Sequence, residues 1–529
     1  MLKKIQQDFS YYSHEFKDNY RKGVHRLRTI LASRAQAQAF VSNAGGVAVV
    51  LGYEPETPDK NAQELYALLA ASPYIDDAVQ TFLGSIYEAG AESQDAMYSD
   101  SARCLEILHD PVLSRAAGAG TVSAGKWIAA LAGQSCATYT DIAAVAASET
   151  AMTAVAASET AMAAVVSNAT ALNAVVTSQV ALNAVAASET AMAAVIGNAT
   201  ALNVVATSQA AMNAVAASET AMTAVIANTA AFNTVVTSHV AMNAVASSYV
   251  AVAAVYESAV AVEAVKANET AWATLTGASG AVMGKAAAKL AGLNPADYAD
   301  MTAVASSSTA MTAIAASQTA MTAIIGNSTA LNAVVSSSTA MAAVAASYVA
   351  VAAVYGSAVA VDAVKANETA WATLTGATSA VMGKAVAVLS GLNPDSYADM
   401  TAVASSSTAM TAVAASSTAM AAVASSSTAR TAITNSATAK NALASSPLKT
   451  TVTKGNRNDW ENRTIRKGMG WLISCYNANS GGEAGSTWYK LDGVQTSQPA
   501  GTTNVGKFFT SSLAIYWWSS TSSVTYIPC

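Results

Sequence analysis

The stretch Ser148-Glu-Thr-Ala-Met152-Thr-Ala-Val155-Ala-Ala157 is one copy of a ten-residue unit that repeats through the middle of this chain. A large apolar residue occupies the same place in each unit, and Val usually follows it three positions later. In the first run of units the large residues are Met152, Met162, Leu172, Leu182, Met192, Leu202, Met212, Met222, Phe232 and Met242. Apolar positions that are three and then seven apart match one face of a helix, whereas a strand would alternate apolar and polar residues. The repeat therefore predicts helices.

The residue four places before each large apolar residue is Ser or Asn. Both are favoured at a helix N-cap, because their side-chain oxygen accepts a hydrogen bond from a free N–H of the first turn. Gly197, just before Asn198, is typical of a left-handed residue that ends a helix. Pro447, just after Ser446, is typical of a first helical position. We therefore predict that each unit is a capped helix of about two turns, which ends in a tight corner and stacks on the next unit.

Two other architectures remain open for the repeat. On one continuous helix the ten-residue repeat would correspond to about 3.3 residues per turn, so the apolar stripe would drift much faster than in a heptad coiled coil. The frequent Ser, Thr, Val and Asn also lower the helix propensity of such a long segment. A β-solenoid suits the Val and Thr content but not the spacing of the apolar residues. Stacked short helices, and hence a mainly α fold, are the favoured prediction.

A longer repeat contains these units. The block Tyr249–Thr302 recurs 99 residues later as Tyr348–Thr401, and a weaker copy lies around Gly125–Asp141. The ten-residue units restart after these copies, at Ile142, Met301 and Met400. We therefore expect an elongated repeat rod over residues 121–449, in three modules with junctions near 121–141, 277–300 and 376–399. Repetition suits this composition, because small Ala and Val side chains bury little area and stability must come from stacked neighbours.

Residues 1–120 differ from the rod and predict an N-terminal helical domain. Helical patterns occur around Leu65–Ala70 and Ile75–Tyr87, and Ser72-Pro73 is typical of a helix start. The opening stretch is rich in basic residues, namely Lys17, Arg21, Lys22, Arg26, Arg28 and Arg34. We expect this domain to attach the chain to a partner protein. The alternative is a solvated charged surface with no partner.

Residues 450–529 predict a small C-terminal β domain. They hold five of the eight Trp residues among Gly, Ser, Thr and Asn, and short apolar stretches such as Phe508–Trp518 are bounded by turn residues. Aromatic rings with a polar tip suit sugar or protein surfaces. The candidate receptor-binding residues are Trp488, Tyr489, Tyr516, Trp517 and Trp518. The alternative is that half or more of the rings form the core of a domain that is short of Leu and Ile.

Composition excludes several classes of function. Only 11% of residues are charged and the net charge is −6, so nucleic-acid binding, which needs clustered Lys and Arg, is not expected. The mean hydropathy is +0.32, yet no apolar run of 18 residues occurs, and we predict no membrane span. The N-terminus starts Met1-Leu-Lys-Lys and lacks the apolar segment of a secretory signal.

Motifs for catalysis or cofactors are weak. The segment Gly120–Lys126 has the spacing of a phosphate-binding loop, but Trp127 stands where a Ser or Thr would bind Mg²⁺, and we interpret its glycines as part of a helix junction. The four histidines do not cluster with acids or cysteines, so no metal and no cofactor are predicted. Cys475 and Cys529 could pair, or they are free buried thiols. No nucleophile and base stand out, and we predict that the chain is not an enzyme.

The repeat and the ending carry a resemblance to a known family. Units such as Ser-Ser-Thr-Ala-Met-Thr-Ala-Val at 406–413 resemble the Ala/Ser/Thr-rich repeats of tail fibre proteins from tailed bacteriophages. The ending, from Gly468-Met-Gly-Trp471 through Trp488-Tyr-Lys-Leu-Asp-Gly493 to Tyr526-Ile-Pro-Cys529, is similar to a small fibre-tip domain. The resemblance covers residues 121–529.

This resemblance implies a virion protein of the tail or fibre. Its N-terminal domain would dock on other virion proteins of the tail or capsid, the repeat rod would act as a spacer, and the tip would bind a glycan or protein of the host surface. It also implies a homo-oligomer, with a trimer as the common form. The rival interpretations are a bacterial surface adhesin or filament subunit, located at the cell surface, and an ice-binding protein with regular Thr rows.

Overall fold

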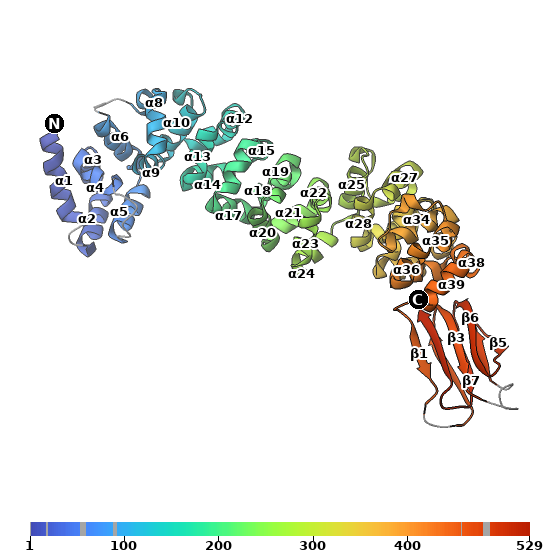
Figure 1. Ribbon diagram of the computed structural model, residues 1–529. Coiled ribbons are helices and arrows are strands. Elements are labelled where there is room, and N and C mark those ends of the chain that lie inside the picture. The colour runs from blue at the N-terminus through green and yellow to red at the C-terminus, as the bar shows by residue number, and fades with distance from the viewer. Residues whose placement is uncertain (1, 17–19, 53–59, 88–92, 456–457, 480–486) are drawn as a thin grey trace. The chain divides into compact units, whose positions relative to one another are not determined.

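The computed structural model describes residues 2–16, 20–52, 60–87, 93–455, 458–479 and 487–529 (Figure 1). Thirty-nine α-helices lie in series in this part of the chain, and eight strands follow them. The predicted mainly α fold with a C-terminal β region is confirmed. The chain divides into two compact units, Met1–Leu275 and Thr276–Cys529.

The first unit begins with helices of ordinary, irregular packing. Their bounds are α1 (Leu2–Phe16), α2 (Tyr20–Ala32), α3 (Arg34–Val41), α4 (Ala44–Leu51), α5 (Lys60–Ala70), α6 (Ile75–Ile86), α7 (Gln94–Tyr98), α8 (Ser101–His109) and α9 (Pro111–Ala117). The rings of Phe16 and Phe40, 5.8 Å apart, form part of the core. The predicted helical segments around Leu65–Ala70 and Ile75–Tyr87 correspond to α5 and α6, respectively. The predicted helix start at Ser72-Pro73 is wrong, because α6 begins at Ile75 and the Ser72 hydroxyl accepts a hydrogen bond from Tyr74 N within a turn (3.4 Å).

In the repeat of the first unit, each ten-residue unit is a separate short helix. Their bounds are α11 (Ile142–Ala147), α12 (Glu149–Ala157), α13 (Glu159–Ser167), α14 (Ala169–Thr177), α15 (Gln179–Ala187), α16 (Glu189–Gly197), α17 (Ala199–Thr207), α18 (Gln209–Ala217), α19 (Glu219–Ala227), α20 (Thr229–Thr237), α21 (His239–Ser247), α22 (Tyr249–Glu257), α23 (Ala259–Lys266) and α24 (Glu269–Thr276). From α11 to α23 one residue forms each corner: Ser188 ends α15 and also caps α16, where its hydroxyl accepts a hydrogen bond from Ala191 N (3.2 Å). Successive helices are bent sharply, by 99° between α12 and α13. Neither a continuous helix nor a β-solenoid is present in this region.

Three helices complete one coil of this repeat. Helix α12 packs on α15, α15 on α18 and α18 on α21, and the two intervening series, α13-α16-α19-α22 and α14-α17-α20-α23, pack in the same way. The partner for stacking is therefore the third helix along, not the next one as predicted, because each corner turns the chain by roughly a third of a circle. Met192 and Val195, both at most 3% exposed, point into the coil with Ala191.

The cap serines also join one coil to the preceding one. The Ser188 hydroxyl donates a hydrogen bond to the carbonyl of Ala156, 32 residues earlier (2.5 Å). The same bond joins Ser178 to Ala146, Ser218 to Ala186, Ser238 to Ala206 and Ser248 to Ala216, and, in the second unit, Ser337 to Ala305, Ser347 to Ala315, Ser436 to Ala404 and Ser446 to Ala414. The stacked helices are thus linked by hydrogen bonds at their corners as well as by apolar packing.

Two predicted helix-end signals are wrong. Gly197 is the last residue of α16 and has no positive φ, because Asn198 itself makes the corner in an extended conformation (φ −118°). No helix starts at Pro447; the chain turns there and enters the first strand, while the Ser446 hydroxyl accepts a hydrogen bond from Leu448 N (3.0 Å). Gly197 therefore does not end a helix in a left-handed conformation, and Pro447 does not begin one.

The module junctions share one local structure. Each has an eleven-residue helix followed by a 3₁₀ turn, namely α10 (Thr121–Leu131) with η1 (Cys136–Thr138), α25 (Gly280–Leu290) with η2 (Pro295–Asp297), and α34 (Ser379–Leu389) with η3 (Pro394–Ser396). A Cβ on Gly125 would lie 2.3 Å from the backbone carbon of Asp141. Gly284 and Gly383 meet Asp300 and Asp399 in the same way. These glycines therefore allow a close backbone approach, which confirms their interpretation as junction residues.

In the second unit the capped helices continue. Their bounds are α26 (Met301–Ser306), α27 (Ser308–Ala316), α28 (Gln318–Gly326), α29 (Ser328–Val335), α30 (Ser338–Ala346), α31 (Tyr348–Tyr355), α32 (Ala358–Lys365), α33 (Glu368–Thr375), α35 (Met400–Ser405), α36 (Ser407–Ala415), α37 (Ser417–Ser425), α38 (Ser427–Thr434) and α39 (Ala437–Ala444). Helices α27, α30 and α33 stack as in the first unit. The Tyr355 hydroxyl shares a hydrogen bond with the Ser425 hydroxyl (2.5 Å), which links α31 to α37 across the junction helix α34.

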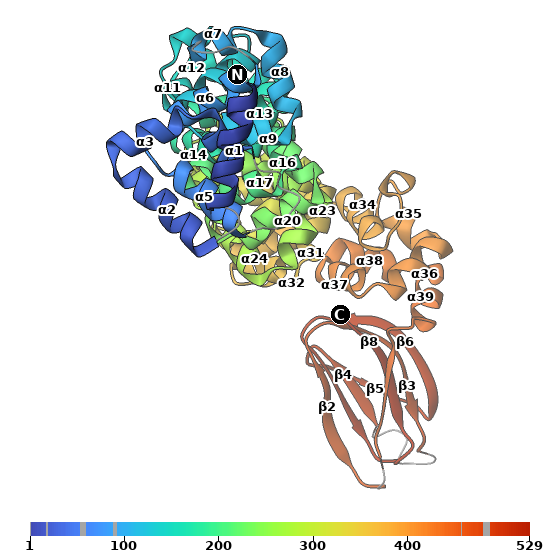
Figure 2. The same ribbon diagram turned by 90° about the vertical axis from the view of Figure 1, so that its left-hand side faces the viewer.

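The C-terminal β domain contains two four-stranded antiparallel sheets (Figure 2). The strands are β1 (Thr450–Thr453), β2 (Glu461–Lys467), β3 (Gly470–Asn477), β4 (Trp488–Leu491), β5 (Val494–Ser497), β6 (Gly501–Phe509), β7 (Ser512–Trp517) and β8 (Ser523–Pro528). Their orders are β1-β8-β3-β6 and β2-β7-β4-β5. Side chains of both sheets, including Leu472, Phe509 and Ile515, form one buried core. Helix α38 of the repeat packs against β6, which is an edge strand of the first sheet.

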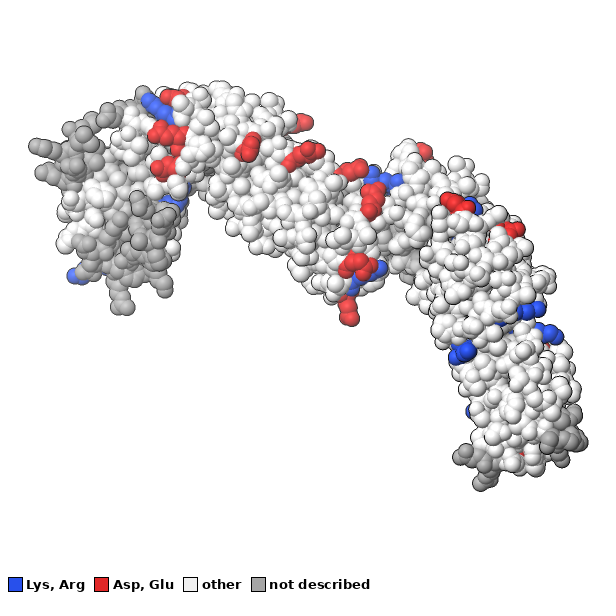
Figure 3. Space-filling view, viewed as in Figure 1, with Lys and Arg blue, Asp and Glu red and all other residues white. Residues whose placement is uncertain are grey.

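One face of the repeat carries few charges. Figure 3 shows wide areas without Lys, Arg, Asp or Glu over the repeat helices. In the described part of the chain no single helix is long and apolar enough to cross a membrane; nine pairs of successive helices would qualify by length and composition only, and each of these pairs is bent by 90° or more.

Candidate functional site

Four aromatic side chains gather on the outer face of the sheet β2-β7-β4-β5. We call Trp460, Trp488, Tyr516 and Trp518 the aromatic row. Ile515 and Trp517 of strand β7 are buried, whereas Tyr516 and Trp518, the residue directly after the strand, are half-buried and point away from the core. Trp488 of β4 is the direct partner of Tyr516 in the sheet, and Trp460 directly precedes β2 on the other side of β7.

The rings of the aromatic row contact one another. The Tyr516 ring stacks on Trp460 at 4.8 Å and on Trp488 at 5.3 Å between ring centroids, and Trp460 meets Trp518 at 5.6 Å. The Lys490 ammonium lies 5.6 Å from the centre of the Trp488 ring. Each of the four side chains is only half-buried. The row therefore offers ring edges and parts of ring faces to a ligand, together with the indole N–H and phenol O–H groups.

The five predicted receptor-binding residues separate into two groups. Trp488, Tyr516 and Trp518 belong to the aromatic row. Tyr489 and Trp517 are 4% and 0% exposed and lie in the core between the sheets, as the alternative interpretation of these rings described. The Trp517 indole N–H donates to the carboxylate of Glu461 (3.1 Å). Tyr489 and Trp517 thus cannot contact a receptor in this fold.

Trp460 was not among the predicted binding residues. It stands alone before a mixed polar segment, so its neighbours in sequence do not mark it as part of an aromatic surface. The register supplies the missing signal: Glu461 pairs with Trp517 and Asn462 with Tyr516, which brings Trp460 beside the end of β7.

Uncharged polar residues accompany the aromatic row on the same sheet. Asn462 pairs with Tyr516 and Ser497 pairs with Trp488. Thr464 and Gln495 lie two residues away from them on the same strands, β2 and β5. Hydroxyl and amide groups beside aromatic rings suit a ligand with both apolar faces and hydrogen-bonding groups.

A tight hairpin closes this sheet. Asp492 and Gly493 connect β4 to β5, and both have positive φ (51° and 86°), as a two-residue type I′ turn requires. The Asp492 carboxylate accepts hydrogen bonds from backbone N–H groups of Thr510, Ser511 and Ser512. Partial burial by itself would raise the pKa of Asp492, but these hydrogen bonds outweigh it and lower the pKa to about 2.

All four cysteines are free. Cys475 lies in the core between the sheets, and Cys529 at the end of the chain is half-buried. Burial raises the pKa of both thiols to about 12. The suggested Cys475–Cys529 disulfide is therefore absent.

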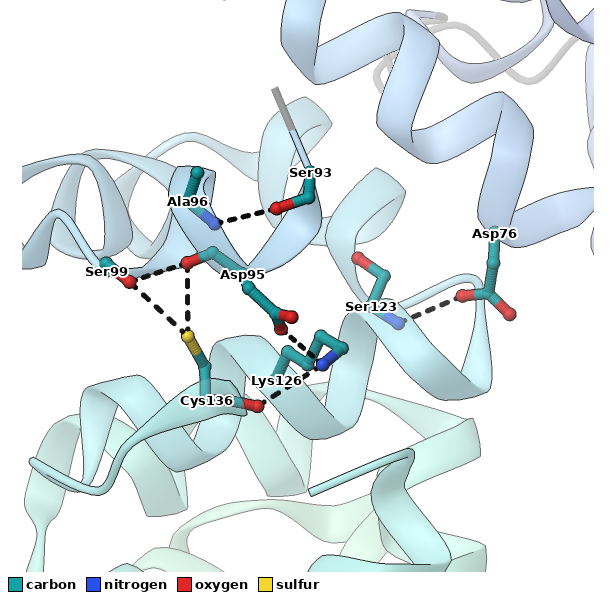
Figure 4. A network of polar contacts seen from close by, with 8 residues as sticks. All are labelled: Asp76, Ser93, Asp95, Ala96, Ser99, Ser123, Lys126 and Cys136. Carbon is teal, nitrogen blue, oxygen red and sulfur yellow. Dashed lines mark hydrogen bonds and ion pairs between the residues drawn. The ribbon is translucent and has the colours of Figure 1, made fainter. Parts of the chain in front are cut away.

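The segment that resembles a phosphate-binding loop is part of a helix. Gly120 caps α10, and Lys126 lies within it, paired with the Asp95 carboxylate and donating to the Cys136 carbonyl at 3.3 Å (Figure 4). The Asp76 carboxylate accepts a hydrogen bond from Ser123 N (2.9 Å) at the start of α10. Burial raises the pKa of Asp76, although hydrogen bonds from Ser123 and Val122 act in the opposite direction. These groups stabilise the helix start and the junction.

The basic residues of the N-terminal domain lie mostly at the surface. Lys22, Arg26 and Arg28 are exposed on α2 and Arg34 is exposed at the start of α3. Arg26 approaches Glu15 at 4.0 Å. Lys17 lies outside the described residues, and so does the side chain of Arg21.

No family model matches this sequence, and no curated protein matches it either. In the described part of the chain, no group of three or more His, Cys, Asp or Glu side chains is placed to hold a metal ion. The contacting, half-buried rings of the aromatic row make it the candidate functional site.

Proposed function

We propose that this chain is a virion fibre protein of a tailed bacteriophage, in which the C-terminal β domain binds a receptor on the host surface. The observation that carries the proposal is the aromatic row, a set of four contacting, half-buried rings on the outer face of one sheet. Soluble proteins seldom leave large aromatic groups together at the surface unless they bind something there.

The capped-helix repeat supports the role of a spacer. Helices of one coil pack mainly on those of the neighbouring coils, so length can be added by repetition without a new core. The face of the repeat seen in Figure 3 has wide areas without charged residues, which offer little for charge-based recognition. Recognition is therefore assigned to the β domain and attachment to the N-terminal domain, whose exposed Lys22, Arg28 and Arg34 would face an acidic surface of another virion protein.

The receptor is a glycan or a protein of the host cell surface. Several copies of the fibre on one particle, each a homo-oligomer, would convert a weak single contact into strong attachment, since binding after the first contact is intramolecular. A trimer is the form proposed from the resemblance.

The test is binding of the purified full chain to a panel of bacterial strains. Trp460→Ala and Trp488→Ala are each expected to weaken binding to the host strain by about tenfold or more, because both remove a ring from the row. Tyr476→Ala is the matched control, since Tyr476 is an exposed ring (42%) on the other sheet. Near-ultraviolet circular dichroism checks that each variant is folded. Unchanged binding by folded Trp460→Ala and Trp488→Ala would remove the site assignment.

A further inference from the structure

Five polar side chains are buried together at one end of the β domain. They belong to the ends of four strands: Asn477 ends β3 and Asn479 lies two residues beyond it, Thr487 precedes β4, Gln498 follows β5 and Ser522 precedes β8. None is more than 6% exposed, and Gln498 is fully buried. Buried polar groups of this kind are normally hydrogen-bonded, so each free atom calls for a partner.

Most of this polar cluster is internally bonded. The Asn477 amide donates to the Gln498 carbonyl (3.0 Å), and the Asn477 side-chain oxygen accepts from Asn479 N (3.1 Å). The Thr487 hydroxyl accepts from the Asn479 amide (3.1 Å), and Ser522 accepts from Ala478 N (3.1 Å). These bonds hold Asn479 and Gln498 in fixed positions.

Three atoms of the cluster have no partner. They are Oε1 and Nε2 of Gln498 and Oδ1 of Asn479. The whole Gln498 amide is thus shielded from bulk solvent without a hydrogen bond, although Met or Leu would fill the same space without that penalty. The arrangement is explained if a small bound group supplies the missing bonds.

The free atoms indicate the chemistry of that group. They comprise two carbonyl-type acceptors and one NH₂ donor, and the five side chains of the cluster carry no charge. A metal cation would satisfy only the oxygens, and an anion only the NH₂ group. A hydroxyl oxygen both donates and accepts. We propose that the polar cluster is a binding site for a neutral hydroxyl ligand, either a buried water molecule or a hydroxyl group of a small polyol or sugar.

The experiment measures hydrogen exchange of the full chain by mass spectrometry, over peptides that cover β3 and β8. Gln498→Met keeps the size of the side chain and removes its bonds to the ligand, so exchange there should become about tenfold faster. Asn504→Leu, which removes an exposed amide of β6 with a side chain of similar size, is the matched control and should change nothing. If Gln498 were simply unpaired, Gln498→Met would leave exchange unchanged or slow it, and the proposal would fail.

Two further arms identify the source of the hydroxyl group. Oxygen-17 relaxation dispersion should count at least one more long-lived water in the wild type than in Gln498→Met if the ligand is water. If it is a polyol, glycerol or glucose should slow exchange in the wild type but not in the variant. Absence of both differences overturns the proposal, as does wild-type protection that disappears with EDTA and returns with Ca²⁺. This inference is independent of the fibre role, because none of these readouts uses host cells.

Discussion

A serine at a helix corner makes two bonds with one hydroxyl group. Ser188 accepts from Ala191 N in its own helix and donates to the Ala156 carbonyl in the preceding coil. The first bond could be predicted from the sequence, because Ser stands at a regular distance before the apolar residues. The second could not, since its acceptor is 32 residues away and becomes a neighbour only when three helices complete a coil.

The identity of the acceptor residue matters for this bond. In every described pair that forms it, the carbonyl belongs to Ala. Where the equivalent position is β-branched, as at Val176, Ile226 and Ile325, the described cap serines Ser208, Ser258 and Ser357 do not make it. The extra methyl group next to the backbone crowds the approach of the short serine hydroxyl to the carbonyl, whereas the longer Asn367 amide still donates to the Val335 carbonyl at the same spacing (3.3 Å).

Replacing one cap serine should therefore cost more than replacing a surface serine. Ser188→Ala removes an N-cap and an inter-coil bond, and we expect it to lower stability by about 1–2 kcal/mol. Ser167→Ala is the control, because the Ser167 hydroxyl bonds only to the Ala163 and Ala164 carbonyls of its own helix, and its cost should stay below about 0.5 kcal/mol. Denaturant unfolding followed by the helical circular dichroism signal measures both. Equal losses in the two variants would contradict the double role of the cap.

At the level of elements, the short capped helices could be predicted, but the size of the coil was missed. A signal for it was present: Asn replaces Ser as the cap at Asn168, Asn198 and Asn228, which are 30 residues apart. That spacing equals one coil of three helices, so these caps lie in one series of stacked corners. The period of ten dominates the sequence because the helices of all three stacked series need the same buried Met and Val. Only the exposed and cap positions differ from one series to another.

At the candidate site, too, the sequence predicted the residues of β7 but not which of them reach the surface. Tyr516, Trp517 and Trp518 are adjacent in sequence and were predicted to act together. Successive side chains in a strand point to opposite faces, so Trp517 must be separated from the other two. Which face is the core depends on the second sheet, and this could not be known from the aromatic residues alone.

The hairpin at Asp492 predicts a pH dependence of the β domain. The pKa of its carboxyl is lowered from about 3.8 to about 2 in the folded chain, so its contribution is fully present above pH 4 and is lost as the pH falls toward 2. Because this group is largely exposed, we expect a loss of only about 1 kcal/mol after solvent screening is allowed for. Asp492→Asn tolerates the positive φ but lacks the charge, and the difference between it and the wild type should shrink below pH 4.

Tryptophan fluorescence during denaturant unfolding, repeated from pH 6 to pH 2.5, checks this prediction. The comparison of the two proteins cancels the titration of other carboxylates in the domain. A constant difference between wild type and Asp492→Asn over the whole range would show that the hydrogen bonds to the carboxylate do not stabilise the hairpin.

On the scale of the whole molecule, the duplicated sequence does not decide where the chain divides. The segment Glu269–Thr276 recurs as Glu368–Thr375, yet the chain separates into compact units only at the first copy. Within the second unit, the bond between Tyr355 and Ser425 joins the two modules. Three modules could be predicted from the repeat, but a single bond of this kind is not visible in its period.

Each unit has its own stacked helices and its own buried residues, so each should fold alone. We expect separately produced fragments 1–275 and 276–529 to be folded, with circular dichroism spectra that, weighted by length, add up to that of the full chain. Dividing the chain inside α19 instead removes the stacking of α19 on α16 and α22, and both fragments should lose helical signal because a solenoid is stable only through contacts between neighbouring coils. If either unit is unfolded until the other is added, its core depends on the partner unit, and the division at Leu275 would not be a boundary of folding.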